Sequence, residues 1–293
     1  MTFSHPDHRG TIHVEDAPIL DHQPHPAGQW ILRVAAPRCA ARAEPGSFAH
    51  LRVSPERPMR RPLSIMRTDP EAGWVEFLYK VVGEGTRLLS ECRPGESISL
   101  LGPIGNPFRP DPERPRTLLL GGGVGIPPMV FLADRLRRAT GFRPFVIMGS
   151  EVPFPFHARP STLRVPGMPD GVIAAMPLME DWGIPSRLAS LKGYPGCFEG
   201  YMTELARAWL AALDDRHRAE VEIFACGPHP MLEATARLAA EYKLPCQVSL
   251  EAFMACAVGG CAGCTVPVNT PEGPAMKRVC VDGPVFDARA VFG

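Results

Sequence analysis

Short apolar runs broken by Pro and Gly fill the chain from residue 29 to 101. Four of these runs predict β-strands, because they are short, apolar and separated by turn signals. They cover residues 30–34, 46–53, 74–82 and 97–101. With the turn signals between them, they predict about six closely spaced strands, which is typical of a small antiparallel barrel or sandwich.

Beyond residue 115 the pattern changes to strands that alternate with amphipathic helices. Buried strands are predicted at 116–120, 145–148 and 221–225, and helices at 128–140, 201–213 and 230–242. Such alternation predicts a parallel α/β layer. Residues 150–200 are rich in Pro and Gly, and we expect a strand or two there with long loops.

The fold class predicted from these patterns is an α+β multidomain protein. We expect an antiparallel β-barrel at 27–112, a parallel α/β domain at 113–245 and a small cysteine-rich domain at 246–293, which holds five of the nine cysteines. Residues 1–26 are expected to be a polar tail. This segment contains His5, His8, His13, His22 and His25, which could indicate a metal site. The irregular spacing of these histidines favours a polar tail instead.

Charge and composition narrow the classes of function. The 31 basic residues balance the 31 acidic ones, whereas nucleic-acid binders usually carry a basic excess. No run approaches the roughly 20 apolar residues of a membrane span. Residues 1–10 lack the apolar segment of a secretory signal, so we expect a cytoplasmic protein. In the reducing cytosol, clustered cysteines bind metal more often than they form disulfides.

The cysteines near the C-terminus have a spacing with chemical meaning. Cys256, Cys261 and Cys264 follow the pattern C-x4-C-x2-C, and Cys280 comes after fifteen intervening residues. This is the plant-type spacing for a [2Fe–2S] cluster, and the intervening glycines allow a loop to bend around it. A structural zinc site is the alternative, but zinc ligands usually come as two short C-x2–4-C pairs. The spacing therefore favours iron–sulfur.

Two glycine-containing turns follow predicted strands of the α/β half. Residues 121–125 read GGGVG and lie between a strand and a helix, where backbone amides can bind a phosphate. Residues 226–228 read CGP and follow the strand at 221–225. Ligands of open α/β sheets bind at the carboxyl ends of the strands. Either turn alone could serve packing only, but together they favour a dinucleotide site.

Two weaker motifs lie in the barrel half. Residues 60–65 read RRPLSI and are expected between two barrel strands, and residues 79–86 read YKVVGEGT. An arginine can bind a pyrophosphate with two hydrogen bonds, and a Gly-Thr turn at a helix start offers further donors. Taken singly, a solvated arginine and an ordinary turn are the simpler explanations.

The order of these motifs resembles the ferredoxin–NADP reductase superfamily. Within it, the chain is most similar to the electron-transfer subunits of NAD-linked dihydroorotate dehydrogenases. The resemblance runs from about residue 31 to 286 and is most specific in SLEAFMACAVGGCAGC at 249–264 and KRVCVDGPVF at 277–286. One departure is at 149–156, GSEVPFPF, where relatives usually carry an arginine.

The resemblance implies three groups of cofactor-binding residues. The first would hold FAD: Arg61, Pro62, Leu63, Ser64, Leu78, Tyr79, Lys80, Gly85 and Thr86. The second would hold NAD(H), with the cysteine near the nicotinamide: Gly121, Gly122, Gly123, Val124, Gly125, Cys226, Gly227 and Pro228. The third would hold the [2Fe–2S] cluster: Cys256, Cys261, Cys264 and Cys280.

The implied function is electron transfer in pyrimidine biosynthesis. A nicotinamide exchanges two electrons as a hydride and an iron–sulfur cluster exchanges one, so a flavin belongs between them. The partner implied is an FMN-containing catalytic subunit that oxidises dihydroorotate, joined in a heterotetramer. No catalytic residue is required of this chain. The alternatives are a ferredoxin–NAD(P) oxidoreductase, a hydrogenase or oxygenase reductase subunit, and a non-catalytic redox-sensing module.

Overall fold

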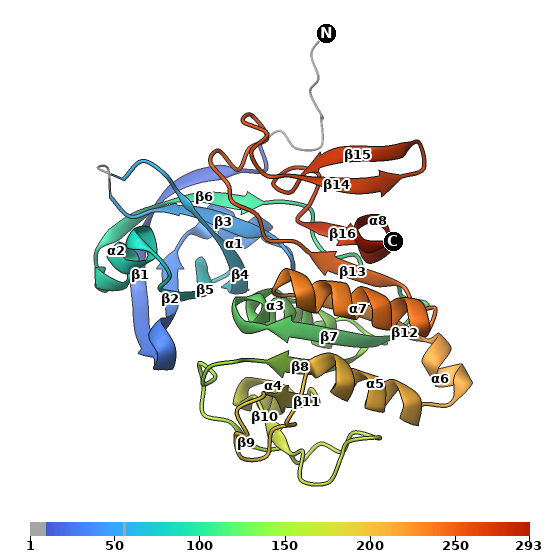
Figure 1. Cartoon of the computed structure of the whole chain (residues 1–293). Coiled ribbons are helices and arrows are strands. Elements are labelled where there is room, and N and C mark those ends of the chain that lie inside the picture. Colours follow the sequence, from blue (N-terminus) through green and yellow to red (C-terminus); the bar gives the residue numbers. More distant parts are fainter. Residues whose placement is uncertain (1–9, 55–56) are drawn as a thin grey trace.

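The first half of the chain forms a closed barrel of six antiparallel strands. The structure is a computed structural model that describes residues 10–54 and 57–293. The strand order around the barrel is β1-β2-β5-β4-β3-β6, which confirms the predicted antiparallel barrel (Figure 1). The strands are β1 (His13–His25), β2 (Gln29–Ala35), β3 (Phe48–Arg52), β4 (Arg61–Asp69), β5 (Trp74–Lys80) and β6 (Ser97–Ile104).

Alternation along each strand fills the barrel interior. In β6 every second residue is buried, including Ile98 and Leu100, and in β5 Phe77 and Tyr79 point into the same core. Successive side chains of a strand face opposite sides, so the other residues cover the outside. The connections contain η2 (Pro26–Gly28), α1 (Pro37–Arg42) and α2 (Glu84–Glu91).

The structure corrects the sequence interpretation at the start of the barrel. Residues 13–25, expected in a polar tail, form β1, which pairs with β6 and β2 and closes the barrel. The alternation was hidden because Ala17 and Ile19 are the buried apolar residues of β1, while its other positions are mostly polar. Residues 61–65, expected between strands, begin β4. His5 and His8 lie outside the described residues.

The second half is built on a six-stranded sheet in the order β11-β8-β7-β12-β13-β16. Its first five strands are parallel, as the sequence predicts, and β16 runs antiparallel to β13 at the edge. The strands are β7 (Arg116–Gly122), β8 (Arg143–Gly149), β11 (Ser186–Ala189), β12 (Val221–Cys226), β13 (Cys246–Ser249) and β16 (Val285–Asp287).

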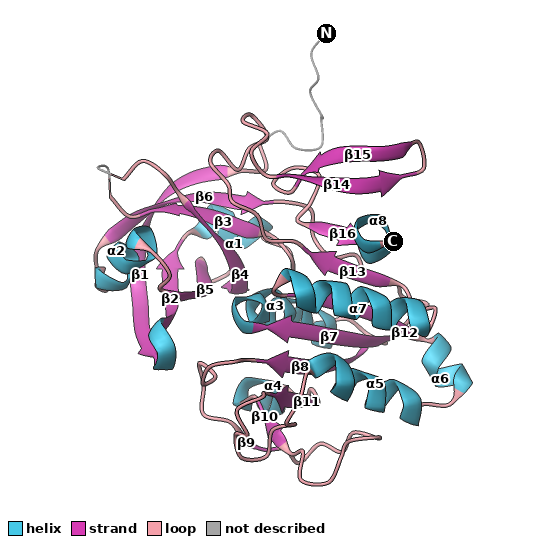
Figure 2. Ribbon diagram, in the orientation of Figure 1, coloured by secondary structure: helices cyan, strands magenta, loops and turns pink. Residues whose placement is uncertain are grey.

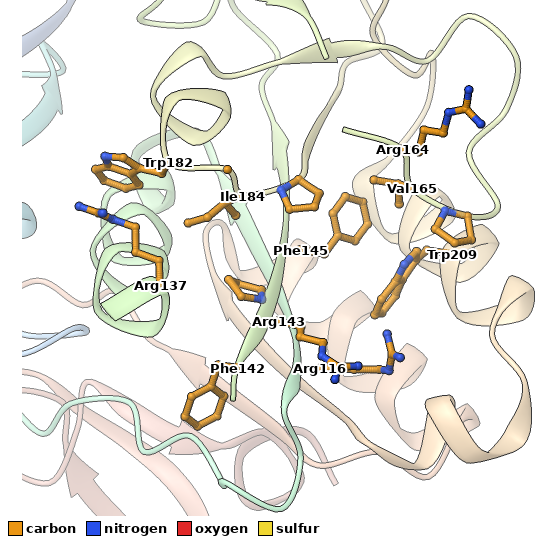
Figure 3. A pocket seen from close by; sticks show the side chains of 14 residues that line it. Arg116, Arg137, Phe142, Arg143, Phe145, Arg164, Val165, Trp182, Ile184 and Trp209 are labelled. Carbon is orange, nitrogen blue, oxygen red and sulfur yellow. The ribbon is translucent and has the colours of Figure 1, made fainter. Parts of the chain in front are cut away.

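Residues 150–200 form mostly loops, as expected, with three short strands and one helix. β9 (Arg159–Pro160) pairs with β10 (Ala174–Ala175), α4 (Pro177–Asp181) follows, and β11 then joins the main sheet. Parts of this segment, at 164–166 and 183–185, border a pocket together with the first residues of β7 and β8 (Figure 3).

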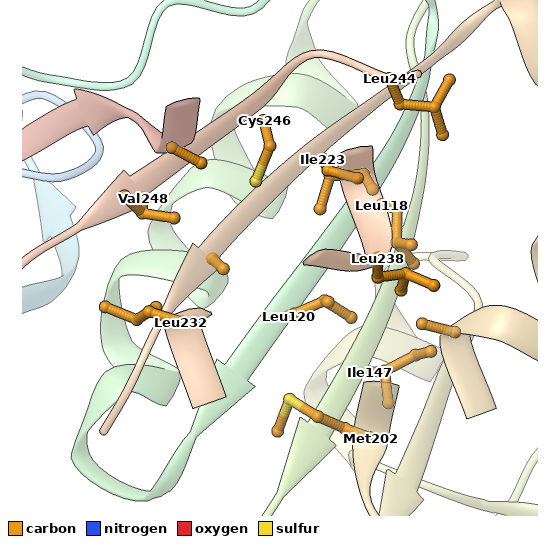
Figure 4. Close-up of a cluster of buried hydrophobic side chains, with 14 of the residues drawn as sticks. Leu118, Leu120, Ile147, Met202, Ile223, Leu232, Leu238, Leu244, Cys246 and Val248 are labelled. Atoms are coloured by element: carbon orange, nitrogen blue, oxygen red, sulfur yellow. The ribbon is translucent and has the colours of Figure 1, made fainter. Parts of the chain in front are cut away.

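Helices cover both faces of the sheet (Figure 2). Leu118 and Leu120 of β7 pack in one core with residues of two helices, α5 (Met202–Ala212) and α7 (His229–Glu241) (Figure 4). Leu119 faces the opposite core, which contains one side of α3 (Ile126–Arg138). Strands buried on both faces read as continuous apolar runs, which explains the sequence of β7. The short elements η3 (Gly123–Gly125) and α6 (Asp215–Ala219) complete this half.

The boundary expected at residue 246 does not separate the C-terminal segment from the α/β sheet. Two of its strands, β13 and β16, belong to the α/β sheet. Between them the chain leaves the sheet to form the cysteine loop and a hairpin, and it ends in a helix. These elements are β14 (Thr265–Thr270), β15 (Gly273–Arg278) and α8 (Ala288–Phe292). The segment also contacts the barrel half, because the side-chain amide of Asn106 donates to the carbonyls of Val281 and Asp282 at 3.2 and 3.0 Å.

Among the residues with described positions, no helix is long and apolar enough to cross a membrane.

Candidate functional site

The two glycine turns of the α/β half meet at the carboxyl edge of the sheet. Gly121 of β7 and Cys226 of β12 are register partners, so the turns that follow them start side by side. A Cβ atom built on Gly125 would lie 2.2 Å from the carbonyl oxygen of Cys226 and 2.6 Å from the amide nitrogen of Gly227. Position 125 therefore requires glycine, because the two backbones touch there.

The same contact continues through Gly122. A Cβ on Gly122 would lie 2.5 Å from the sulfur of Met231, and a Cβ on Gly227 would lie 2.6 Å from it. Met231, in the first turn of α7, thus packs on both glycines. Gly123 has a φ of 55°, which turns the chain into α3, and Val124 is 38% exposed. The turns form one surface of backbone amides at the starts of α3 and α7, which suits a phosphate.

Cys226 lies under this surface and is not exposed. The residue is 1% exposed. Its thiol is hydrogen-bonded to the side chain of Ser249, which is its register partner on β13. Burial raises the pKa of the Cys226 thiol, and the nearby Glu251 carboxylate raises it further. The residue is therefore a neutral thiol at physiological pH. Toward a ligand at this edge, the Cys226 thiol would act as a small hydrophobic group that carries only a weak hydrogen-bond donor.

In the barrel half, Arg61 lies directly against the start of α2. A Cβ on Gly85 would lie 1.9 Å from the Nε atom of Arg61, so only glycine lets the guanidinium approach the first turn of the helix. The Arg61 side chain also donates to the carbonyl of Met59. A fixed guanidinium beside the free amides of a helix start is a site for an anion such as a pyrophosphate.

Thr86 shapes this helix start. Its hydroxyl accepts hydrogen bonds from the amides of Val82 and Gly83 at 3.0 and 3.2 Å, and it donates to the carbonyl of Gly83 at 3.0 Å. The side chain is 8% exposed. Thr86 therefore holds the turn of α2, and its hydroxyl proton is already used within the turn.

The remaining barrel residues of the predicted site divide between two faces of their strands. Arg61, Pro62, Leu63 and Ser64 begin β4 and are partly exposed. Leu78 of β5 packs toward the α/β half. Tyr79 points into the barrel, where its hydroxyl lies 2.9 Å from Nε2 of His22, and burial raises its pKa. The Tyr79 side chain is thus unavailable to a ligand, and only its backbone could contribute.

The four clustered cysteines lie in and beside one loop. The sulfurs of Cys264 and Cys280 are 3.3 Å apart, although 16 positions separate them in sequence. The amide of Cys261 donates to the sulfur of Cys256, and the amide of Gly263 donates to the sulfur of Cys261, each at 3.4 Å. Cys264 and Cys280 are buried, while Cys261 is exposed.

The backbone of this loop is turned so that its amides face sulfur. Ala257, Gly259 and Ala262 have φ values of 56°, 79° and 54°. Burial opposes ionisation of Cys256, but amide hydrogen bonds from Val258, Cys261 and Gly260, with one from the Cys261 side chain, lower its pKa to about 7. Burial and the neighbouring Cys264 raise the pKa of Cys280 to about 12.

This donor set fits an iron–sulfur cluster. Amide-to-sulfur hydrogen bonds are a general feature of such clusters and tune their potential. A single metal ion fits less well, because no group of three or more His, Cys, Asp or Glu side chains converges on one point within 10–54 and 57–293.

His50 is a residue of this region that sequence reasoning misses, because it stands in an ordinary strand pattern. It is fully buried on β3, and its ring nitrogens lack hydrogen bonds of normal geometry, although the backbone of Met254 beside the cysteine loop is close. Burial, together with the charge of Arg60, lowers the pKa of His50 to about 4. His50 is therefore a neutral group between the barrel and the cysteine loop.

Barrel, α/β sheet and cysteine loop together define an oxidoreductase electron-transfer protein of the ferredoxin-reductase type with an iron–sulfur domain. A solved structure of an NADH-dependent reduced ferredoxin-NADP oxidoreductase is similar with a TM-score of 0.76 and 26% identity, covering 94% of this chain and 90% of the other. The ferredoxin reductase of carbazole 1,9a-dioxygenase shares the fold, with a TM-score of 0.60 and 23% identity over 80% of this chain and 67% of the other.

The sequence relatives identify the family. The model of the iron–sulfur cluster binding domain of dihydroorotate dehydrogenase B matches residues 251–292. The chain is 32% identical to the dihydroorotate dehydrogenase B (NAD(+)) electron transfer subunit of Geobacillus sp. (strain WCH70), over 94% of this chain and 98% of the relative. It is 33% identical to that of Bacillus caldolyticus, over 85% and 86%. The chain belongs to this family of electron transfer subunits, which confirms the resemblance noted in the sequence.

The contact between the two glycine turns can be tested by filling it. We expect Gly125→Ala to lower the free energy of unfolding by about 1–3 kcal/mol, because the new methyl group overlaps the Cys226 carbonyl. Denaturant unfolding measures this. Val124→Ala changes the exposed neighbour and is the matched control. Equal midpoints for Gly125→Ala and the wild type would show that the turns do not touch.

His50 should make the fold sensitive to acid. The unfolded chain binds a proton near the ordinary pKa of 6.5, whereas the folded protein does so only near 4. Stability is therefore complete above pH 6.5 and falls as the pH drops toward 4, by on the order of 1–3 kcal/mol. We expect His50→Leu to reduce this acid-induced loss, measured as unfolding midpoints at neutral pH and about pH 5.

The matched control for that experiment is His157→Leu, since His157 is exposed. It should keep the wild-type pH dependence. If His50→Leu and His157→Leu behaved alike, the neutral buried state of His50 would be contradicted.

Proposed function

We propose that this chain transfers electrons between NAD and an FMN-containing catalytic subunit that oxidises dihydroorotate, using FAD and a [2Fe–2S] cluster. The observation that carries the proposal is the convergence of three sites. The cysteine segment is bound to the sheet through β13 and β16, and to the barrel half at Asn106. The chain also matches 98% of a Geobacillus relative that is named as the electron transfer subunit of dihydroorotate dehydrogenase B (NAD(+)).

FAD would be held by the barrel. Arg61 and the first turn of α2 offer a guanidinium and free amides to its pyrophosphate, and the close approach at Gly85 supports this. Ser64 and Lys80 are partly exposed, and Leu78 faces the α/β half, so these residues suit the flavin end. Pro62, Leu63, the backbone of Tyr79 and the turn held by Thr86 complete this proposed site.

NAD(H) would be held at the joined glycine turns. Gly121–Gly125 and Cys226–Pro228 present backbone amides at two helix starts, which favours the phosphates of a dinucleotide. Cys226 would lie beneath the nicotinamide as a neutral thiol. We assign it no proton transfer, because its pKa is raised.

Cys256, Cys261, Cys264 and Cys280 would be the cluster ligands. When bound, the flavin exchanges a hydride with the nicotinamide and single electrons with the cluster. The chain needs no general acid or nucleophile for this chemistry. Its residues instead position the cofactors, and the amides of the cysteine loop stabilise charge on the sulfurs.

The proposed partner arrangement is a heterotetramer with the catalytic subunit, in the cytoplasm. All nine cysteines are free thiols, which supports a reducing compartment.

A second candidate is favoured by one specific observation. The ferredoxin-NADP oxidoreductase structure aligns with 94% of this chain. A ferredoxin would then take the place of the dihydroorotate-oxidising subunit, and the cofactors would be unchanged. Identifying the partner distinguishes the two proposals.

Removal of the Arg61 guanidinium should weaken flavin binding. We expect Arg61→Ala to raise the dissociation constant for FAD by about 10–100-fold, because charge-assisted hydrogen bonds contribute about 1.5–3 kcal/mol. Flavin fluorescence during titration of the flavin-free protein measures this. Arg87→Ala is the matched control, since Arg87 lies on the exposed side of α2 and pairs with Glu91. Equal affinities for the two variants would contradict the Arg61 site.

Reconstitution tests the whole function. We expect the chain, combined with an FMN-containing dihydroorotate-oxidising subunit, to reduce NAD⁺ when dihydroorotate is added. Cys261→Ser should lose most of this coupled activity and its iron–sulfur absorption, yet keep NADH-dependent reduction of a dye through the flavin. Cys197→Ser, which changes a half-buried thiol outside the loop, is the control and should keep both activities.

Two results of that experiment would contradict the proposal. One is coupling to a ferredoxin but not to the dihydroorotate-oxidising subunit. The other is a purified protein that holds zinc and shows no flavin or iron–sulfur absorption.

A further inference from the structure

One charged side chain contacts the cysteine loop without belonging to the proposed cluster ligands. Arg278 is the last residue of β15 and stands two positions before Cys280. Its Nη1 atom donates to the carbonyl of Gly259, in the middle of the loop, at 3.2 Å. The segment that carries Cys280 is thus connected through a side chain to the loop that carries the other three cysteines.

The backbone at Gly259 allows this close contact. Its φ of 79° lies in the left-handed region that favours glycine. A Cβ atom at this position would lie 3.2 Å from Nη1 of Arg278 and 2.6 Å from Cγ2 of Val281. Any other residue at 259 would therefore press on the guanidinium and on the turn that follows Cys280.

The contact also sets the direction of the next amide. The carbonyl of Gly259 and the N–H of Gly260 belong to one planar trans peptide, so they point in opposite directions. Arg278 holds the carbonyl, while the amide of Gly260 donates to the sulfur of Cys256. Burial raises the pKa of Cys280, and the nearby amide of Gly259 opposes that rise. The residue that Arg278 holds therefore serves two of the four sulfurs.

Arg278 is itself fixed in place. The carboxylate of Asp282 accepts from the backbone amide of Arg278 at 2.7 Å and from its Nε atom at 3.4 Å. The carbonyl of Asp282 in turn accepts from the side-chain amide of Asn106, which follows the barrel strand β6. The Arg278 side chain is 41% exposed, so water screens its charge. Its contacts with the loop are therefore of more consequence than its charge.

We propose that Arg278 is a positioning residue for the [2Fe–2S] cluster and raises its reduction potential by directing loop amides at the sulfurs. This inference rests on the proposed cluster site. Reduction adds an electron to a centre already held by four thiolates, and N–H groups that face sulfur stabilise the added negative charge. Without the guanidinium, the peptide between Gly259 and Gly260 is free to rotate and its contact with Cys256 weakens. The reduced cluster is then less stable, and its potential falls.

A redox titration of the full, cofactor-loaded chain, followed by EPR of the reduced cluster, tests this inference. We expect Arg278→Gln to lower the equilibrium constant for one-electron reduction about 10-fold, which corresponds to about 59 mV. Arg278→Lys, which keeps a donor for the Gly259 carbonyl, should recover part of this shift. Loss of iron–sulfur absorption in the presence of a chelator should be about 10-fold faster in Arg278→Gln, because the ligands are held less firmly.

Two further variants separate position from charge. Lys277→Gln removes the same charge from the neighbouring residue of β15, whose side chain faces the other side of the strand. It is the matched control and should keep the wild-type potential. Asp282→Ala removes an anion, so charge alone would raise the potential. We expect a fall instead, because Arg278 loses the group that orients it.

Three outcomes would overturn the inference. These are a wild-type potential in Arg278→Gln, equal shifts in Arg278→Gln and Lys277→Gln, and a raised potential in Asp282→Ala. All three are measured on a cluster that the wild type visibly holds. A wild type without the EPR signal of a reduced [2Fe–2S] cluster would contradict the proposed function as well, so the two failures are distinguishable.

Discussion

The return of the chain into the sheet determines how this molecule is assembled. After β13 the chain leaves the sheet at Ser249, and it returns at Val285 to pair with the same strand. Both ends of the cysteine segment are thereby fixed to one strand. The segment is also bound to the barrel half, because the backbone amide of Asn106 donates to the carbonyl of Gly283 at 2.7 Å. The cysteine loop is consequently held where barrel and sheet meet, and it is not free to move as a separate domain.

The groups buried at this junction share an electrostatic property. Burial favours the uncharged form of both His50 and Cys226, since it lowers the pKa of the imidazole and raises the pKa of the thiol. Both side chains are therefore uncharged at this junction. Charge there would be stabilised by fixed backbone dipoles, such as the amides of the cysteine loop and of the helix starts.

The sequence predicts the parts of this structure whose signal is local. The buried strand at 116–120, the helix after it and the spacing of the cysteines each depend on neighbouring residues, and the structure has these elements within a few positions. Strand β1 is not predicted from sequence because its core contribution comes from few apolar residues and one of its two partners, β6, lies about eighty positions away. The same limit applies to His50 and to the contact of Arg61 with Gly85, which exist only after distant segments pack together.

The hairpin between the third and fourth cysteines has a consequence for the evolution of the loop. Thr265 and Arg278 are paired at its base, next to Cys264 and near Cys280, while its turn lies at 270–273. Residues can be added or removed in pairs at the turn without altering the base, because strand register repeats every two residues. The number of residues between these two cysteines therefore does not determine the distance between their sulfurs. The turn of the hairpin can therefore change in length while the cluster ligands stay in place.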